Sequence, residues 1–284
     1  MKTETAQKPI TNLQGTWELN NGYKMPYLGL GVWKAEDGEE VINAIKWAID
    51  AGYRHIDTAK AYDNEEGVGK GIKASGVDRK ELFITSKLWN TDQGYESTLN
   101  AFHKTLDRLD TDYLDLYLIH WPVEGKYKDT WRAMEKLYKE GKIKAIGVSN
   151  FLEHQLKDLM EDAEIHPMVD QLEFHPWLVQ KDLQKFCAEN NIQYEAWSPL
   201  MQGKAFKNET LKEIGEKYGK TPAQVVLRWD LQNGVITIPK STSQDHIKSN
   251  ADLFDFELSE DDMQTINALD RNERIGPDPD KFDF

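Results

Sequence analysis

The chain of 284 residues is 39% hydrophobic and 30% charged, as in an ordinary soluble globular protein, and it is long enough to bury a large core. Its 35 basic and 49 acidic residues give a net charge of −14, which argues against nucleic acid or an anionic membrane as the main partner. A single cysteine excludes an intrachain disulfide, the N-terminal residues lack the apolar stretch of a secretory signal, and no apolar run approaches the ~18 residues of a membrane span, so we expect a cytoplasmic protein.

In chain order, the first predicted element is a β-hairpin over residues 16–29. It carries Asn21-Gly22 between two β-rich runs, which predicts a type I′ turn. Short β-rich runs then alternate with segments whose apolar residues recur at helical spacing, such as 39–52, 95–109 and 129–142. The β-rich runs predict eight strands: 28–33, 53–59, 82–89, 113–120, 145–150, 168–174, 192–199 and 235–240.

This alternation of strands and helices predicts parallel strands joined by helical crossovers. Eight such units in a chain of this length favour a (β/α)8 TIM barrel, with a doubly wound open sheet as the alternative. No linker or shift in composition divides the chain, so we expect residues 1–284 to form one domain. The tail 271–284 is rich in proline and aspartate and cannot form a long helix.

Polar side chains stand at the ends of these predicted strands, where the active site of a (β/α)8 barrel lies. Packing alone gives no reason for polar residues at the same end of so many strands. They are Asp57, Lys87, His120, Ser149, Asn150, Gln171, Ser198, Lys240, Ser241 and Thr242.

Four residues, Asp57, Tyr62, Lys87 and His120, would converge at this end. A tyrosine has an ordinary pKa of ~10, and an ammonium group such as that of Lys87 stabilises the phenolate. Asp57 would supply the counter-charge for Lys87, and His120 could orient a substrate carbonyl. No side chain can supply a hydride, so this proton donor implies a nicotinamide cofactor. Taken singly, Asp57 could instead be a helix N-cap and His120 a core residue.

Motifs along nearly the whole chain resemble the aldo-keto reductase family. They are GYRHIDTAKAYDNEEGVG (52–69), TSKLW (85–89), DLYLIHWP (115–122), GKIKAIGVSNF (141–151), QLEFHP (171–176), AWSPL (196–200) and IPKS (238–241). The resemblance implies the barrel fold and a catalytic tetrad of Asp57, Tyr62 as proton donor, Lys87 and His120. LWNTDQGYEST, KYKDTWRAMEKLYKEGKI and EAWSPLMQG are most similar to the bacterial glyoxal and methylglyoxal reductases.

The resemblance also implies how the chain would bind NADPH. Ser149, Asn150 and Gln171 would hold the nicotinamide carboxamide, and Trp197 would stack on the ring. Ser198 and Leu200 would contact the pyrophosphate, and Asn250 would face the adenine. The residues that would approach the adenosine 2′-phosphate are Lys240, Ser241, Thr242 and His246. Trp33, Trp89, His120 and Trp121 would line the substrate pocket, although the tryptophans could also be plain core.

One position departs from the family pattern, because His246 stands where arginine is usual. Arginine grips a phosphate with two hydrogen bonds and always carries charge, whereas histidine as a residue type carries little charge near pH 7. We therefore expect a reduced preference for NADPH over NADH, with NADPH still used because Lys240 remains. The histidines show no metal-ligand spacing, so we expect no metal site.

The resemblance implies a monomer that reduces aldehydes and ketones to alcohols, with small reactive carbonyls such as methylglyoxal and glyoxal as substrates. It also implies that the C-terminal tail folds over the mouth of the barrel. Two alternatives to the reduction of small carbonyls stay open. One is a reductase of diketo-sugar acids such as 2,5-diketogluconate, and the other is a nicotinamide-binding regulatory subunit without rapid turnover.

Overall fold

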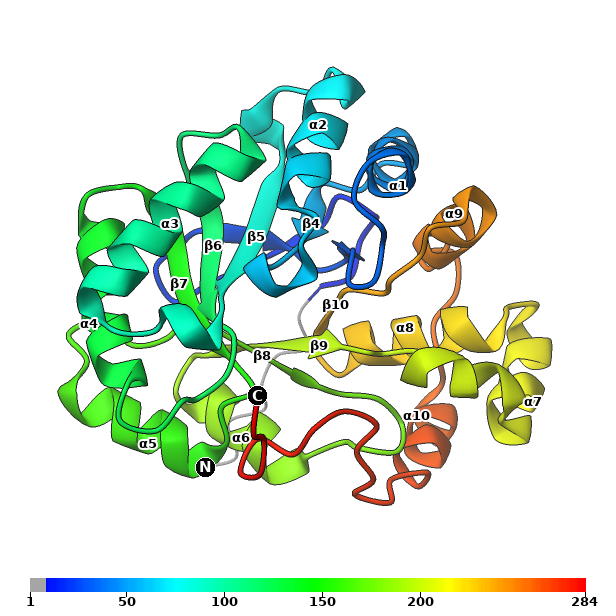
Figure 1. Cartoon of the computed structure of the whole chain (residues 1–284). Helices are drawn as coiled ribbons and strands as arrows, with labels where there is room; N and C mark the ends of the chain where they lie inside the picture. The colour runs from blue at the N-terminus through cyan, green and yellow to red at the C-terminus, as the bar shows by residue number, and fades with distance from the viewer. Residues whose placement is uncertain (1–8) are drawn as a thin grey trace.

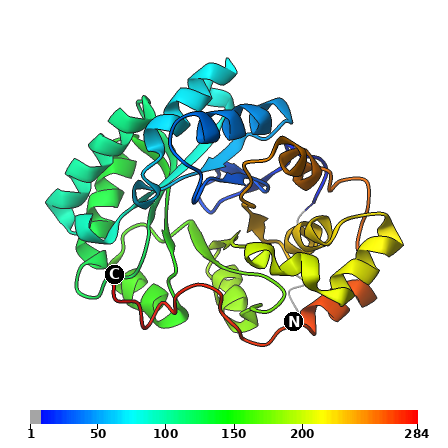
Figure 2. The same cartoon turned by 45° about the vertical axis from the view of Figure 1, so that its right-hand side comes forward.

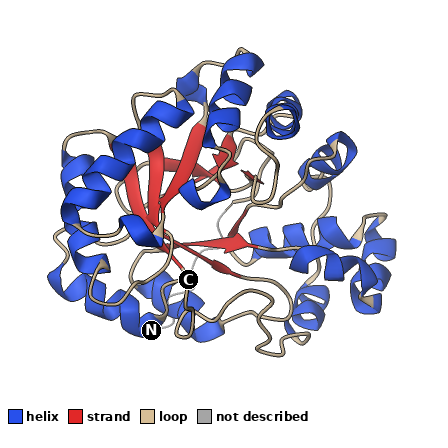
Figure 3. Cartoon of the chain, in the orientation of Figure 1, coloured by secondary structure: helices blue, strands red, loops and turns tan. Residues whose placement is uncertain are grey.

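The structure is a computed structural model that describes residues 9–284. At its centre lies an eight-stranded parallel sheet. Neighbouring strands follow the order β10-β9-β8-β7-β6-β5-β4-β3, so each strand pairs with the next one along the chain (Figures 1 and 3). The strands are β3 (Leu30–Gly31), β4 (His55–Asp57), β5 (Phe83–Leu88), β6 (Leu114–Ile119), β7 (Ile143–Ser149), β8 (Val169–Glu173), β9 (Gln193–Trp197) and β10 (Ile236–Thr237).

Main-chain contacts between the first and last strands close this sheet into a barrel. Parallel bridges join Leu28 to Thr237 and Gly31 to Lys240, and the Gly29 N–H donates to the Thr237 carbonyl at 3.0 Å. A Cβ atom at Gly31 would lie 2.8 Å from the Ile238 carbonyl oxygen, so this close approach requires glycine. The predicted (β/α)8 barrel is therefore confirmed, and the doubly wound alternative is wrong.

Helices cover the outside of the strands (Figure 2). In α1 the buried residues Val41, Ala44, Ile45 and Ala48 recur at helical spacing, which places one apolar stripe against the barrel. No helix within residues 9–284 is long and apolar enough to cross a membrane. The α-helices are α1 (Glu39–Asp50), α2 (Glu65–Ser75), α3 (Tyr95–Leu109), α4 (Tyr127–Lys139), α5 (Glu153–Asp162), α6 (Lys181–Glu189), α7 (Glu209–Tyr218), α8 (Pro222–Gln232), α9 (Gln244–Ala251) and α10 (Glu260–Asn267), and the 3-10 helices are η1 (Lys60–Tyr62), η2 (Arg79–Glu81), η3 (Asn90–Asp92) and η4 (Met201–Lys207).

An antiparallel hairpin of β1 (Thr16–Glu18) and β2 (Lys24–Pro26) precedes the barrel, as predicted, but its turn differs from the prediction. A type I′ turn needs positive φ at both central residues, and here Gly22 has positive φ while Asn21 does not. The Leu19 N–H donates to the Tyr23 carbonyl, and the Gly22 N–H donates to the Leu19 carbonyl. These bonds define a three-residue loop that ends in a left-handed glycine, so the type I′ prediction is wrong.

The C-terminal tail crosses the end of the barrel at which the strands have their C-termini, as expected (Figure 1). The buried Glu173 carboxylate at the end of β8 accepts hydrogen bonds from the main-chain N–H of Ile275 at 2.6 Å and of Gly276 at 3.2 Å. A Cβ atom at Gly276 would lie 2.3 Å from the Trp197 ring, so glycine lets the tail pack directly on that ring. The tail is thus held against the strand ends that carry the candidate site.

Candidate active site

A cavity of about 1090 Å³ opens at the C-terminal ends of the strands. It collects most of the site residues that the sequence singled out, although they come from many different strand ends and loops. Lys87 lies beneath its floor with no exposed surface, and Thr242 is not among the lining residues. The predicted residues that line the cavity are Trp33, Asp57, Tyr62, Trp89, His120, Trp121, Ser149, Asn150, Gln171, Trp197, Ser198, Leu200, Lys240, Ser241, His246 and Asn250.

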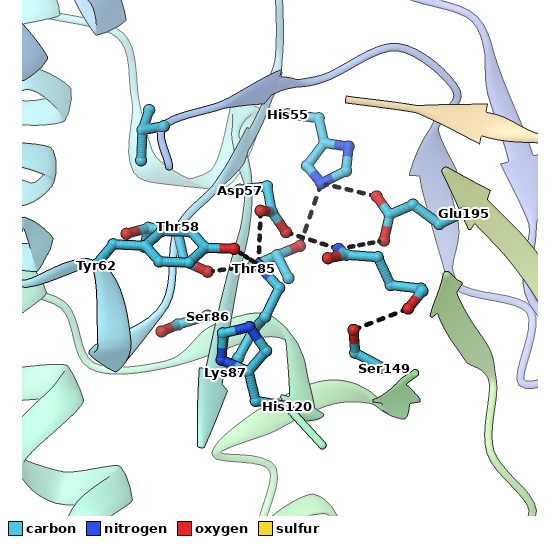
Figure 4. A network of polar contacts seen from close by, with 12 residues as sticks. His55, Asp57, Thr58, Tyr62, Thr85, Ser86, Lys87, His120, Ser149 and Glu195 are labelled. Carbon is cyan, nitrogen blue, oxygen red and sulfur yellow. Dashed lines mark hydrogen bonds and ion pairs between the residues drawn. The ribbon is translucent and has the colours of Figure 1, made fainter. Parts of the chain in front are cut away.

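The Lys87 ammonium group joins three oxygen atoms at the floor of this cavity (Figure 4). Its Nζ atom donates to Asp57 Oδ1 at 2.6 Å, to the Thr58 carbonyl at 2.9 Å and to the Tyr62 hydroxyl at 3.2 Å. Asp57 ends β4, Lys87 lies near the end of β5, and η1 carries Tyr62 back over both strands. The predicted convergence of acid, lysine and tyrosine is present in this geometry.

Burial and charge act in opposite directions on these three groups. Burial raises the pKa of Asp57, and Lys87 and Gln171 oppose this rise. Burial alone would lower the pKa of Lys87, but the nearby Asp57 and Tyr62 raise it above its ordinary value, so the ammonium group stays charged. Burial also raises the pKa of Tyr62, and the Lys87 charge reduces this rise without cancelling it. Tyr62 therefore carries its proton at neutral pH.

His120 lies beside Tyr62 at the cavity wall. The two rings meet edge to face with centroids 5.8 Å apart, and the His120 ring meets Trp89 in the same way at 5.2 Å. Burial, with a contribution from the Lys87 charge, places the pKa of His120 well below its ordinary value. The imidazole is therefore neutral, and it can donate a hydrogen bond without carrying charge into the site.

The three residues predicted to hold a carboxamide form one hydrogen-bonded group. The Ser149 hydroxyl donates to the Gln171 carbonyl at 2.8 Å, and Asn150 Nδ2 donates to the His120 carbonyl at 3.0 Å. Asn150 has a left-handed backbone (φ 64°) at the end of β7, and its Oδ1 accepts from the Trp197 ring N–H at 2.9 Å. These bonds fix the rim of the cavity between β7 and β9.

The hydrogen-bonding capacity left in this group suits a primary amide. Gln171 Nε2 donates to Asp57 Oδ2 at 2.8 Å and to Glu195 Oε2 at 2.9 Å, which engages both of its protons. No residue within 9–284 donates to Gln171 Oε1, and the Asn150 and Ser149 oxygens each retain acceptor capacity. A nicotinamide carboxamide presents an NH2 group that such acceptors can bind. The residues present therefore fit a nicotinamide nucleotide.

The cavity continues past Trp197 toward α9 and the start of α8. Ser198, with a left-handed backbone (φ 55°), and Leu200 lead into η4, and Lys240 follows β10. His246 lies in α9, and both it and Lys240 are exposed on the cavity lining. Neither side chain forms an ion pair with another residue of the described chain. We call this part of the cavity the cofactor arm. It presents the Lys240 ammonium group where the sequence predicted the 2′-phosphate of the cofactor.

The opposite wall of the cavity is aromatic. The Phe284 ring stacks on Trp89, with centroids 5.9 Å apart and an interplanar angle of 4°, and meets Trp121 edge to face at 5.2 Å. Asn90 Nδ2 holds the main-chain oxygen of Phe284 at 3.0 Å. Trp33 lies at the mouth with 43% of its surface exposed. The predicted tryptophans thus line one apolar wall, and the tail completes it.

Two contributors to this site, Glu195 and Phe284, were not predicted from the sequence. Glu195 bonds to Gln171 from β9, and its position in the run Gln193–Trp197, two residues before Trp197, was the available signal, because alternate residues of a strand share a face. Phe284 comes from a tail without periodicity, so no pattern placed it. Within residues 9–284 no cluster of three or more His, Cys, Asp or Glu side chains is placed to hold a metal ion.

The sequence profile described as the aldo/keto reductase family matches residues 14–271. Glyoxal reductase of Bacillus subtilis is 63% identical over 274 residues, which cover 96% of this chain and 99% of that protein. Methylglyoxal reductase DkgA of Salmonella typhimurium is 50% identical and covers 93% of this chain and 96% of its own. A solved structure of a Gox0644 variant in complex with NADPH has a TM-score of 0.91 and 44% identity, covering 95% of this chain and 99% of its own.

Proposed function

The chain belongs to the aldo/keto reductase family and is an oxidoreductase that acts on carbonyl groups, and from that premise we propose that it reduces small reactive carbonyls such as methylglyoxal and glyoxal with NADPH. One observation carries the proposal: the Lys87 ammonium group bridges Asp57 and the Tyr62 hydroxyl at the floor of the cavity. This arrangement suits protonation of a carbonyl oxygen and has no evident value for packing.

In the proposed reaction Tyr62 is the proton donor. When bound beside Trp197, a reduced nicotinamide would supply the hydride for the carbonyl carbon. The neutral His120 imidazole donates a hydrogen bond that orients the carbonyl oxygen toward the Tyr62 hydroxyl. The hydroxyl proton passes to that oxygen, which completes the alcohol, and Lys87 stabilises the phenolate that remains. Asp57 keeps Lys87 charged and aimed at Tyr62.

The proposed substrate range rests on the aromatic wall. Phe284 packs against both Trp89 and Trp121, and Trp89 packs against His120, so the space next to the Tyr62 hydroxyl is bounded by rings. A two- or three-carbon dicarbonyl fits such a space without requiring a charged partner. The names of the two reductases with 63% and 50% identity point to the same substrate class.

We propose that NADH is also accepted. Lys240 and Ser241 would approach a 2′-phosphate on the ribose, and a histidine at position 246 lacks the permanent charge and two-pronged donor of the arginine usual in the family. We further propose that the protein acts as a monomer in the cytoplasm, with Asp57, Tyr62, Lys87 and His120 as catalytic residues. Gel filtration at micromolar concentration tests the monomer.

The experiment that tests this function is NADPH oxidation by the purified protein with methylglyoxal, glyoxal and 2,5-diketogluconate. We expect rapid turnover of the two small dicarbonyls and slow turnover of the sugar acid. Rapid turnover of the sugar acid alone would favour the diketo-sugar-acid alternative. Tight NADPH binding without turnover of any of the three carbonyls would favour the regulatory subunit.

A further inference from the structure

A second carboxyl group, that of Glu195, lies behind the tetrad, inside the barrel. Glu195 on β9 is the register partner of Gln171 on β8, and both side chains are buried. Gln171 Nε2 donates to Asp57 Oδ2 at 2.8 Å and to Glu195 Oε2 at 2.9 Å. One amide group therefore joins the catalytic aspartate to a carboxyl group that does not touch the cavity (Figure 4).

The charges around Glu195 decide its protonation state. Lys87 already donates to three oxygen atoms of other residues. His55 on β4 has Nε2 at 3.7 Å from Glu195 Oε1, but burial lowers the pKa of His55 to about 3, so the imidazole is neutral and forms no ion pair. On the other side, β10 (Ile236–Thr237) contributes no ionisable side chain. Burial and the Asp57 charge raise the pKa of Glu195 to about 8, so it carries a proton at neutral pH.

Two carboxyl groups as acceptors fix the orientation of the Gln171 amide. If this amide turned over, its oxygen would face the Asp57 carboxylate with no proton between the two oxygen atoms, and Asp57 Oδ2 would lose its donor. With Asp57 alone as a partner, the amide could keep one N–H bond and swing its second N–H toward the cavity. Glu195 engages that second N–H, so the carbonyl oxygen Oε1 is left for the cavity side.

We propose that Glu195 is a positioning residue, which holds the Gln171 amide with its oxygen available to the nicotinamide carboxamide. This inference rests on the proposed function, because it assigns Gln171 to the cofactor. It predicts that Glu195 acts on cofactor binding through Gln171 rather than on the barrel as a whole. It also predicts that ionisation of Glu195 adds a second negative charge behind Asp57, which weakens the ability of Tyr62 to donate its proton.

Two substitutions separate the orienting role from the titration. Glu195→Gln keeps an acceptor oxygen for Gln171 Nε2 but cannot ionise, whereas Glu195→Leu removes the acceptor. Asp170→Asn is the matched control, because Asp170 is a neighbouring carboxyl on β8 that is equally buried and forms no hydrogen bond with a tetrad residue of the described chain. Thermal unfolding of each variant reports any loss of stability separately.

The first readout is the dissociation constant of NADPH at pH 7, measured by quenching of tryptophan fluorescence, which needs no turnover. We expect Glu195→Leu to raise this constant about tenfold, corresponding to ~1.4 kcal/mol. Glu195→Gln and Asp170→Asn should stay within about twofold of the wild type. Wild-type affinity in a folded Glu195→Leu protein, or equal loss in all three variants, would overturn the positioning role.

The second readout is the pH dependence of kcat for methylglyoxal. The wild type should lose activity as the pH rises through about 8, where Glu195 ionises, and Glu195→Gln should lack that step. The same step in both proteins would overturn the inference, even if Glu195→Leu fails to fold. The two failures are distinguishable. The proposed function fails if the wild type reduces no small carbonyl, whereas the positioning role can fail in a wild type that turns over rapidly.

Discussion

The floor and the outer wall of the cavity are built in different ways. On the floor, the side chains of Asp57 and Lys87 are almost completely buried, and their positions follow from strand register. On the wall, Trp33 and Phe284 are 43% and 50% exposed, and they come from a loop and from the tail. Regular strands therefore position Asp57 and Lys87, whereas Tyr62 lies on η1 and loops supply the exposed wall of the cavity. Catalysis and substrate choice should respond to different substitutions.

The largest expected effect comes from the floor. Lys87→Met removes the donor that joins Asp57 to the Tyr62 hydroxyl and leaves Asp57 buried without its cation. We expect kcat for methylglyoxal to fall by about 10²–10⁴, the usual range for loss of acid–base catalysis. Steady-state kinetics measures this loss, with circular dichroism as the control for folding. A fall of less than about tenfold in a folded variant would show that the bridge is dispensable.

The next effect concerns the wall. Phe284→Ala removes the ring that stacks on Trp89 and should raise the KM for methylglyoxal about tenfold with little change in kcat. The same variant should gain activity toward bulkier carbonyls such as phenylglyoxal, because the cavity widens. Phe282→Ala is the matched control, since Phe282 contacts Trp121 but does not line the cavity. A loss in kcat alone would mean that the tail takes part in the chemistry.

A smaller effect is expected in the cofactor arm. His246→Arg places a permanent charge and a two-pronged donor beside Lys240. The dissociation constant of NADPH should fall about fivefold, while that of NADH stays the same, because NADH has no 2′-phosphate. Fluorescence titration with each nucleotide makes the comparison. An equal gain for both nucleotides would place His246 away from the 2′-phosphate.

The last expected effect is on stability rather than on activity, and it tests the protonation state of Glu195. Its folded-state pKa of about 8 lies above the ordinary value of 4.5, so the folded protein binds this proton more tightly than the unfolded chain does. The contribution is complete below pH 4.5 and is lost as the pH rises toward 8. Relative to Glu195→Gln, the wild type should therefore lose about 1 kcal/mol of unfolding free energy per pH unit in this window. Denaturant unfolding at pH 5 and pH 8 measures the difference, and parallel pH dependences would contradict it.

The same contrast explains what could be predicted from the sequence. The eight strands were found because each is a short β-rich run between helical patterns, and Asp57, Lys87 and His120 stand at recognisable strand ends. The hairpin turn was missed because Asn21-Gly22 favours a type I′ turn, whereas the pairing of Leu19 with Tyr23 leaves a three-residue loop. The strand pairing decides the turn type, and the two residues Asn21-Gly22 alone do not reveal that pairing.

Glu195 and Phe284 show the limit more clearly. The link from Glu195 to Asp57 depends on the register of β8 with β9 and on closure of the barrel, which join residues 138 positions apart through Gln171. Phe284 reaches Trp89 from a tail that Glu173 anchors at Ile275 and Gly276 and that Asn90 binds at Phe284 itself. Contacts of this kind depend on the assembled fold, and no local run of residues encodes them.

The central claim is that Tyr62, held by Lys87, donates the proton. Its most direct test is a single-turnover experiment in which Tyr62→Phe and wild-type protein, each saturated with NADPH, are mixed with methylglyoxal. We expect an unchanged NADPH dissociation constant and a rate of NADPH oxidation at least about 10²-fold slower in the variant. A transient as fast as that of the wild type would contradict it, and the proton would then have to come from His120 or water.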